Sequence, residues 1–215
     1  MMSTKAHKGV AVQRYFLILT FCLPLAACVS PGVISYDAQR IHGTATSDSQ
    51  KASATKAYLE LPLPFEPIAE IRQDLERREG LTLKNRGEAH ITVITPPEFK
   101  KIQPLLTMNT IEQIASEFKI QETPLKLICI GKGHLKDQPE LGSTFFLVVE
   151  ADRLFAIRHK IAQEFRAKGG LDRDFNPELF YPHVTLGFTQ RDLHYEDGVL
   201  KDESSCLYKL KKRTP

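Results

Sequence analysis

The chain has 215 residues, enough for one well-packed domain, and a formal net charge of +3. Three of its 29 basic residues lie in residues 1–27, which contain no acidic residue, so the remaining chain has 26 basic and 26 acidic residues. A long polyanion is normally bound by clustered Lys and Arg, and this balance excludes such a surface as the main feature. We therefore expect no stable binding of duplex nucleic acid.

The N-terminal segment has the layout of an export signal. Basic residues precede an apolar run over 15–27, which is shorter than the roughly 20 residues of a membrane-spanning helix. The run ends in Leu25-Ala26-Ala27-Cys28, which resembles a bacterial lipobox. This resemblance implies a signal peptide over 1–27 and lipidation of Cys28. A secretory signal without a lipid, or a short buried helix, is the alternative.

A lipidated Cys28 would anchor the exported protein to a membrane. Val29 follows the cysteine where an Asp would retain the protein at the inner membrane, so in a Gram-negative cell we expect the periplasmic face of the outer membrane. Residues 28–56 are poor in large apolar side chains and rich in Ser, Thr, Ala and Gly. This composition predicts a flexible tether, followed by a catalytic domain over 57–215.

Apolar segments of strand and helix type alternate after the tether. One helix is predicted over 67–79 and ends at Gly80, and a helical region follows over 98–118, where Asn109 and Glu112 have the spacing of a capping box. Asp152 is predicted to cap a third helix, which Gly169-Gly170 ends. Strands are predicted over 58–63, 89–95, 125–130, 144–150, 183–188 and 206–210, with a turn-prone segment over 131–142. This order favours an α+β domain with two similar halves.

Two of these strands share a pattern of histidine and threonine. They read Ala89-His90-Ile91-Thr92-Val93 and Pro182-His183-Val184-Thr185-Leu186. Because successive strand side chains point to opposite faces, each strand places an imidazole beside a hydroxyl on one face. A single histidine of this kind is more often structural, but the matched pair indicates a site. A third copy, His42-Gly43-Thr44, lies in the expected tether and is assigned no function.

The matched strands resemble the signature of the 2H phosphoesterases, which include 2′-5′ RNA ligase-like proteins and cyclic phosphodiesterases. The resemblance covers about residues 57–190 and includes Phe180-Tyr181-Pro182-His183 and Gly187. The strings over 86–95 and 181–188 are also similar to the branch found in Swiss Army Knife RNA-repair proteins. The resemblance implies an α+β, two-lobed and pseudo-symmetric fold, with antiparallel sheets flanked by helices and a central cleft.

The same resemblance implies a hydrolase that acts without a metal or other cofactor on a 2′,3′-cyclic phosphate or a related nucleotide or RNA-end phosphodiester. Such a reaction needs a base for water and an acid for the departing ribose oxygen, and imidazole can serve as either near neutral pH. By analogy with the family, His183 is the base and His90 the acid. Thr92 and Thr185 are expected to bind phosphate oxygens. Tyr181 is a candidate for stacking on a base, or else a core or rim aromatic.

Several charged residues have weaker claims. Glu88 has the strand parity of His90 and is a candidate to orient it, although an exposed carboxylate at a strand start is the ordinary interpretation. Lys84, Arg86 and Arg191 are candidates to contact a phosphate, with solvated charges as the default.

Three further classes of function stay open on the sequence, of which the last is a purely structural lipoprotein. A lipoprotein that binds a nucleotide or phosphate without turnover would need the same residues. A zinc protein would use the histidine pair, but Cys, Asp and Glu are not found at recognisable ligand spacings near it. For the enzyme we expect a monomer with a small nucleotide or RNA-end substrate.

Two cysteines are left after the signal peptide and the lipidation site. An oxidising compartment would permit Cys129 and Cys206 to pair. A buried free thiol is the alternative for Cys129, which lies in an apolar strand pattern.

The lipidation hypothesis predicts that Cys28→Ser yields an uncleaved or unlipidated precursor, because the acyl chain requires the thiol of Cys28. Metabolic labelling with a fatty-acid analogue and the size of the product measure this. Cys22→Ser is the matched control and should be labelled like the parent, since Cys22 leaves with the signal peptide. Normal labelling of Cys28→Ser would contradict the hypothesis.

Overall fold

The computed structural model describes residues 32–41 and 58–213, and every structural statement below refers to these residues. The predicted signal peptide over 1–27, the lipidation site Cys28 and residues 42–57 of the expected tether lie outside them. None of the helices in the described ranges is long and apolar enough to cross a bilayer.

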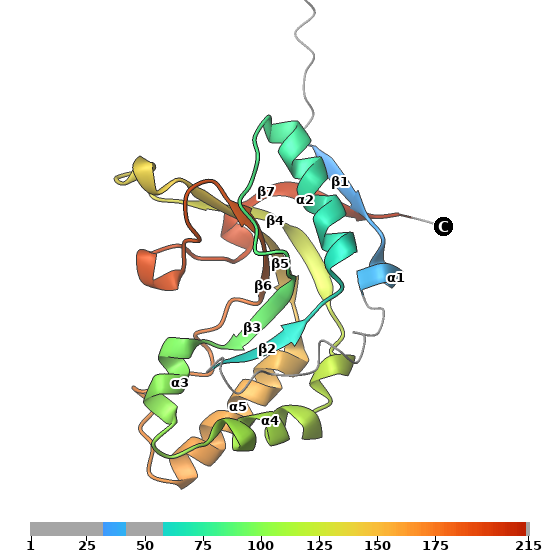
Figure 1. Cartoon of the computed structure of the whole chain (residues 1–215). Helices are drawn as coiled ribbons and strands as arrows, with labels where there is room; N and C mark the ends of the chain where they lie inside the picture. The colour runs from blue at the N-terminus through green and yellow to red at the C-terminus, as the bar shows by residue number, and fades with distance from the viewer. Residues whose placement is uncertain (1–31, 42–57, 214–215) are drawn as a thin grey trace, which may run out of the picture. The chain divides into compact units, whose positions relative to one another are not determined.

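Two sheets form the framework of the domain (Figure 1). The five-stranded sheet has the order β1-β7-β4-β5-β6, with β1 parallel to β7 and its other neighbours antiparallel. The two-stranded sheet pairs β2 with β3 in antiparallel fashion. The strands are β1 (Val33–Tyr36), β2 (Leu59–Pro62), β3 (His90–Ile94), β4 (Lys126–His134), β5 (Ser143–Glu150), β6 (His183–Phe188) and β7 (Cys206–Lys212).

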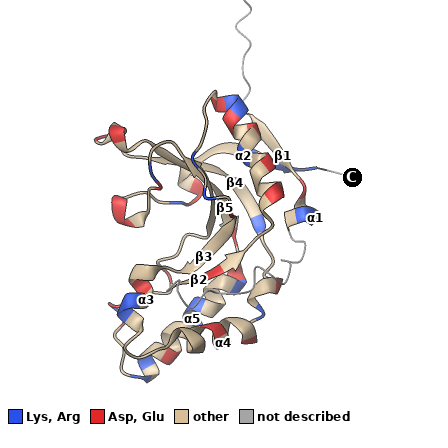
Figure 2. Cartoon of the chain, in the orientation of Figure 1, with Lys and Arg blue, Asp and Glu red and all other residues tan. Residues whose placement is uncertain are grey.

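Helices flank both sheets, which confirms the predicted α+β class (Figure 1). Helix α2 contacts β1 and β6, whereas α5 contacts α4 and β3. Both signs of charge occur on α2 and α3 (Figure 2), and on α2 they form intrahelical ion pairs such as Arg72 with Glu76. The α-helices are α1 (Ala38–Ile41), α2 (Phe65–Glu79), α3 (Pro96–Ile102), α4 (Met108–Glu117) and α5 (Asp152–Ala167).

Apolar side chains cover both faces of the five-stranded sheet. On one face Phe145 and Leu147 of β5 join the main core, which also includes buried residues of β2, β3 and the helices. On the other face Phe146 and Val148 form a smaller cluster with Cys129 of β4. Strand β5 is therefore buried on both faces, as its continuous apolar run indicates.

The helix ends show which capping expectations were right. Gly80 ends α2 in the left-handed conformation with φ 63°, as predicted. The capping role of Asn109 is wrong, because the hydroxyl of Thr107 accepts the backbone N–H of Thr110 and α4 begins at Met108. Asp152 is likewise not the cap of α5 but its first residue, where a carboxylate is favoured by the helix dipole.

A capping box does occur one helix earlier. The side chain of Thr95 accepts from the backbone N–H of Glu98, and the Glu98 carboxylate accepts from the backbone N–H of Thr95. This box fixes the turn that leads out of β3.

Residues 32–41 belong to the folded domain, which corrects the prediction of a tether that begins at Cys28. Strand β1 pairs in parallel with β7, and Ile34, Tyr36 and Ile41 are buried. The expected all-antiparallel sheet is accordingly mixed. So short a strand owes its stability to its neighbour and to packing more than to its own residue pattern, and its apolar residues were too sparse to reveal it.

The two remaining cysteines form a disulfide. Cys129 of β4 and Cys206 at the start of β7 are joined across 77 positions of sequence, which confirms that they pair. Strand β4 also extends to His134, beyond the predicted end at residue 130, because it pairs with β5 along this length.

A protein that begins at residue 57 should be much less stable than one that begins at residue 31. The shorter chain lacks β1 and α1, and each large apolar side chain that is fully buried contributes about 1.5–3 kcal/mol. Urea unfolding followed by circular dichroism measures the difference. Equal unfolding midpoints would show that β1 does not contribute to the fold.

Candidate active site

A cavity of about 780 Å³ is lined by both histidine strands. It brings together every predicted site residue that the structure describes, from β3, from β6 and from the segment before β6; these are His90, Thr92, Tyr181, His183 and Thr185. Cys28 lies outside the described residues.

Both strands alternate as predicted. His90 and Thr92 on β3 are partly exposed, as are His183 and Thr185 on β6. The intervening side chains are buried and belong to the main core: Ile91, Val93, Val184 and Leu186. Each motif therefore presents an imidazole and a hydroxyl from a rigid, half-buried strand.

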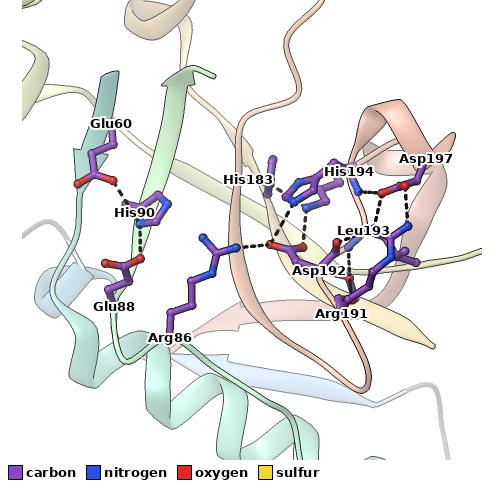
Figure 3. Close-up of polar contacts among 12 residues, drawn as sticks. Glu60, Arg86, Glu88, His90, His183, Arg191, Asp192, Leu193, His194 and Asp197 are labelled. Atoms are coloured by element: carbon purple, nitrogen blue, oxygen red, sulfur yellow. Dashed lines mark hydrogen bonds and ion pairs between the residues drawn. The ribbon is translucent and has the colours of Figure 1, made fainter. Parts of the chain in front are cut away.

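Two carboxylates lie beside His90 (Figure 3). Its Nδ1 is 3.5 Å from Oε2 of Glu60 and 3.8 Å from Oε1 of Glu88. Glu60 lies opposite Thr92 in the β2–β3 ladder, so it shares the cavity face of that sheet. Oε2 of Glu60 is buried and makes no hydrogen bond within the described residues, a costly state for a carboxylate oxygen.

The surroundings of His183 are different. Its Nδ1 is 2.7 Å from the carbonyl oxygen of Tyr181, and its Nε2 is 3.2 Å from Nζ of Lys201. Because a carbonyl only accepts, Nδ1 must carry the hydrogen, and Nε2 of the neutral ring then accepts from the Lys201 ammonium. Burial, and next the charge of Lys201, hold the pKa of His183 well below its ordinary value.

Lys201 and Asp192 join His183 to a wider network. Nζ of Lys201 is 3.3 Å from Oδ1 of Asp192. The other carboxylate oxygen, Oδ2, is 3.9 Å from Nη2 of Arg86 and 3.9 Å from Nε2 of His194 (Figure 3). The His183 side of the cavity thus gathers cations around one nearly buried carboxylate, whereas the His90 side has carboxylates.

Arg158 of α5 fixes the two sides of the cavity relative to each other. Its guanidinium is 1% exposed and donates to the backbone carbonyl of Val93, which follows the first motif, and to the carboxylate of Glu98. It also lies against the rings of Phe175 and Phe180. Other N–H groups of the same guanidinium donate to backbone carbonyls in the loop before His183, those of Asn176, Pro177 and Leu179.

Gly187 allows β6 to pass close to the segment before β3. Backbone hydrogen bonds join Lys84 and Phe188 in both directions, at 2.8 and 3.0 Å. A Cβ on Gly187 would lie 2.7 Å from the carbonyl oxygen of Lys84, too close for any side chain. This crossing brings the two histidine strands to one cavity.

An aromatic pair lies at the cavity. The rings of Tyr181 and Tyr195 are stacked, with centroids 5.9 Å apart and an interplanar angle of 22°. Both line the cavity, and Tyr195 is among the exposed large side chains. Tyr181 is therefore a rim residue and not part of the core.

Sequence reasoning missed several members of the site. Glu60 left a signal, because it is a charged residue between Leu59 and Leu61 in an apolar strand. Arg158 left a similar one within the apolar stripe of α5. Lys201 and Asp192 had no such signal in the sequence, because they lie in loops outside the motifs and only the fold places them at the cavity.

Of the three basic candidates, Arg86 lines the cavity. Nζ of Lys84 instead donates to the carbonyl of Gln190, and Arg191 forms an ion pair with Asp197. Within the described ranges, no group of three or more His, Cys, Asp or Glu side chains is arranged to hold a metal ion.

A comparison with protein families gives one match. The model described as "Swiss Army Knife, 2H phosphoesterase domain" matches residues 57–194, more than half of the chain. Comparisons with curated proteins and with solved structures gave no significant match.

Arg158→Met should lower the free energy of unfolding by about 3–5 kcal/mol, because it removes the ion-pair partner of Glu98 and the donor to the buried carbonyl of Val93. The matched control is Lys160→Met on the same helix, since Lys160 contacts Glu164 and Gln163 at the surface and should change stability by less than about 1 kcal/mol. Chemical unfolding measures both. Equal effects of the two variants would contradict the central role of Arg158.

Proposed function

The chain belongs to the 2H phosphoesterase family, and from that premise we propose that it is a metal-independent phosphodiesterase with His183 as base and His90 as acid. The substrate is a 2′,3′-cyclic phosphate or a related nucleotide or RNA-end phosphodiester. The observation that supports this reaction most strongly is the opposite electrostatic surroundings of the two histidines in one cavity.

His183 suits the base. In the neutral tautomer fixed by the carbonyl of Tyr181, Nε2 has a lone pair that can accept a proton from water as the water oxygen bonds to phosphorus. The lowered pKa of His183 keeps this lone pair available near neutral pH. The adjacent ammonium of Lys201 works in the same direction.

His90 suits the acid. The carboxylates of Glu60 and Glu88 beside Nδ1 stabilise a positive imidazolium, as a buried carboxylate does in hydrolase triads. The opposite nitrogen, Nε2, then gives its proton to the ribose oxygen as the phosphorus–oxygen bond breaks. The product is a phosphate monoester, and the two histidines exchange protons with solvent to return to their starting states.

The two threonines stabilise charge on the phosphate. Thr92 and Thr185 share the cavity faces of their strands with the histidines, and their hydroxyls can donate to non-bridging oxygens. No step of this mechanism uses a metal ion. The role of Tyr181, next to Tyr195, is to stack on a nucleobase.

Replacing either histidine should reduce turnover by at least about a hundredfold, the usual effect of a lost acid or base. The double variant His90→Ala/His183→Ala should lose far less than the product of the single losses, because the pair acts as a unit. Thr92→Val and Thr185→Val should be milder. The purified chain, tested on a panel of phosphodiesters with the 2′- and 3′-phosphate products resolved, provides the measurement.

His159→Ala is the matched control and should keep the parental rate, since His159 lies on α5, pairs with Glu178 and does not line the cavity. A chelator should change nothing. Parental rates for folded His90→Ala and His183→Ala, or activity that is lost with EDTA and restored by zinc, would contradict the mechanism. Tight binding of a phosphodiester without any turnover would favour the non-catalytic binding protein instead.

The rate should rise and then fall with pH. Hydrolysis requires unprotonated His183, whose pKa is lowered below 6.5, so kcat/KM should rise with pH through a limb that lies below pH 6.5. The rate should fall again at higher pH, where the proton that the leaving ribose oxygen needs is lost. Both limbs are macroscopic constants of the coupled pair. An acidic limb above pH 6.5 would contradict the assignment of His183 as the base.

A further inference from the structure

Lys201 is an unusual residue for the interior of this cavity. Its side chain is only 3% exposed, yet Nζ contacts the base candidate His183 and the carboxylate of Asp192. Lysine is almost never buried this far unless it is paired, and this one also lies 5.5 Å from the ring centroid of Phe146. The matched family region ends at residue 194, so Lys201 lies beyond it.

We propose that Lys201 is a positioning and phosphate-binding residue, whose ammonium keeps His183 unprotonated in the free protein and moves to a non-bridging oxygen when a phosphodiester enters. The proposal rests on the proposed function for its substrate class. It adds a third functional group to the two histidine motifs.

The ammonium is held in place by the groups around it. Burial lowers the pKa of Lys201, while the charge and hydrogen bond of Asp192 oppose that effect. The charge of Arg86 also lowers the pKa of Lys201, and the charge of Asp197, like that of Asp192, raises it. The nearly buried carboxylate of Asp192, 3.3 Å away, is therefore what allows a cation to remain at this position.

The contact with His183 depends on the charge of both partners. Nε2 accepts from the ammonium only while the ring is neutral, and a protonated ring would place two cations 3.2 Å apart. The other groups that act on the pKa of His183 are weaker than burial and Lys201: the carbonyl of Tyr181 raises it, and His194 and His90 lower it. Lys201 is the nearest of the cations that favour the neutral base.

The same ammonium has capacity for a ligand. An ammonium has three donors, and in the described residues two of them are directed to His183 and Asp192. Lys201 lines the cavity together with Thr185, which is expected to bind phosphate. When the N–H of Lys201 that donates to Nε2 donates to a phosphate oxygen instead, the lone pair on Nε2 of His183 becomes free to accept a proton from water. Substrate binding and activation of the base are thereby linked.

The test compares Lys201→Met with the parent by NMR titration of the His183 ring. Loss of the cation should raise the titration midpoint of His183 by about one pH unit or more, and should weaken binding of inorganic phosphate at least about tenfold. The acidic limb of kcat/KM should move to higher pH by the same amount. Lys201→Arg keeps the charge and should restore the parental midpoint.

Lys126→Met is the matched control, since Lys126 also pairs with a carboxylate, that of Glu150, but is exposed and does not line the cavity. It should leave the midpoint and the phosphate affinity unchanged. A lysine that served only to neutralise Asp192 would lower stability without moving the His183 midpoint. An unchanged midpoint in folded Lys201→Met would therefore overturn the positioning role, and unchanged phosphate affinity would overturn the binding role.

The unmodified protein supplies a second measurement if Lys201→Met does not fold. Saturation with inorganic phosphate should shift the ¹⁵N resonances of Lys201 Nζ and His183 Nε2, and an unaltered Nζ signal would overturn the proposal. The NMR titration, the phosphate-binding measurement and the ¹⁵N measurement do not need turnover. A chain that hydrolyses no phosphodiester but shows these shifts would refute the proposed reaction and leave the role of Lys201 standing.

Discussion

The geometry of the site depends on the buried guanidinium of Arg158. One side chain of α5 donates to the strand that bears His90, to the turn after it and to the loop that leads into His183. A planar guanidinium with five N–H donors in fixed directions can bind acceptors on three segments at once, whereas the donors of a lysine all lie on one nitrogen. Because the guanidinium is almost fully buried and its bond to Val93 is buried as well, loss of this side chain would leave a buried acceptor unsatisfied.

The two histidine strands have similar motifs but neighbours of opposite charge. The imidazoles are held by the same backbone pattern, but β2 supplies Glu60 to the first, and the chain after β6 supplies Lys201 to the second. Two imidazoles with neighbours of opposite charge suit the opposite roles that acid–base catalysis requires. The roles proposed for His90 and His183 thus rest on neighbours outside the motifs, which is why spacing in the sequence does not distinguish acid from base.

Features that depend on residues close together in the sequence could be predicted, and features that depend on distant residues could not. The alternation of β3 and β6, the end of α2 at Gly80 and the shared face of each histidine and threonine depend on residues a few positions apart, and these expectations are confirmed. Strand β1 depends on β7, far along the chain, and was missed for that reason. The ends of α4 and α5 were misplaced because Asn109 and Asp152 favour several positions in the first turn of a helix.

The segment after the second motif lines part of the cavity beyond the end of the family match. The family match ends at residue 194, yet Tyr195, Val199 and Lys201 line the cavity. Directly after this segment, Cys206 is joined to Cys129 of β4, whose neighbours on that face of the sheet are Phe146 and Val148. Phe146 in turn contacts both the ring of His183 and the ammonium of Lys201. The disulfide therefore ties the segment that carries Lys201 to the apolar side chains that contact His183, and an oxidising environment would favour the contact between Lys201 and His183.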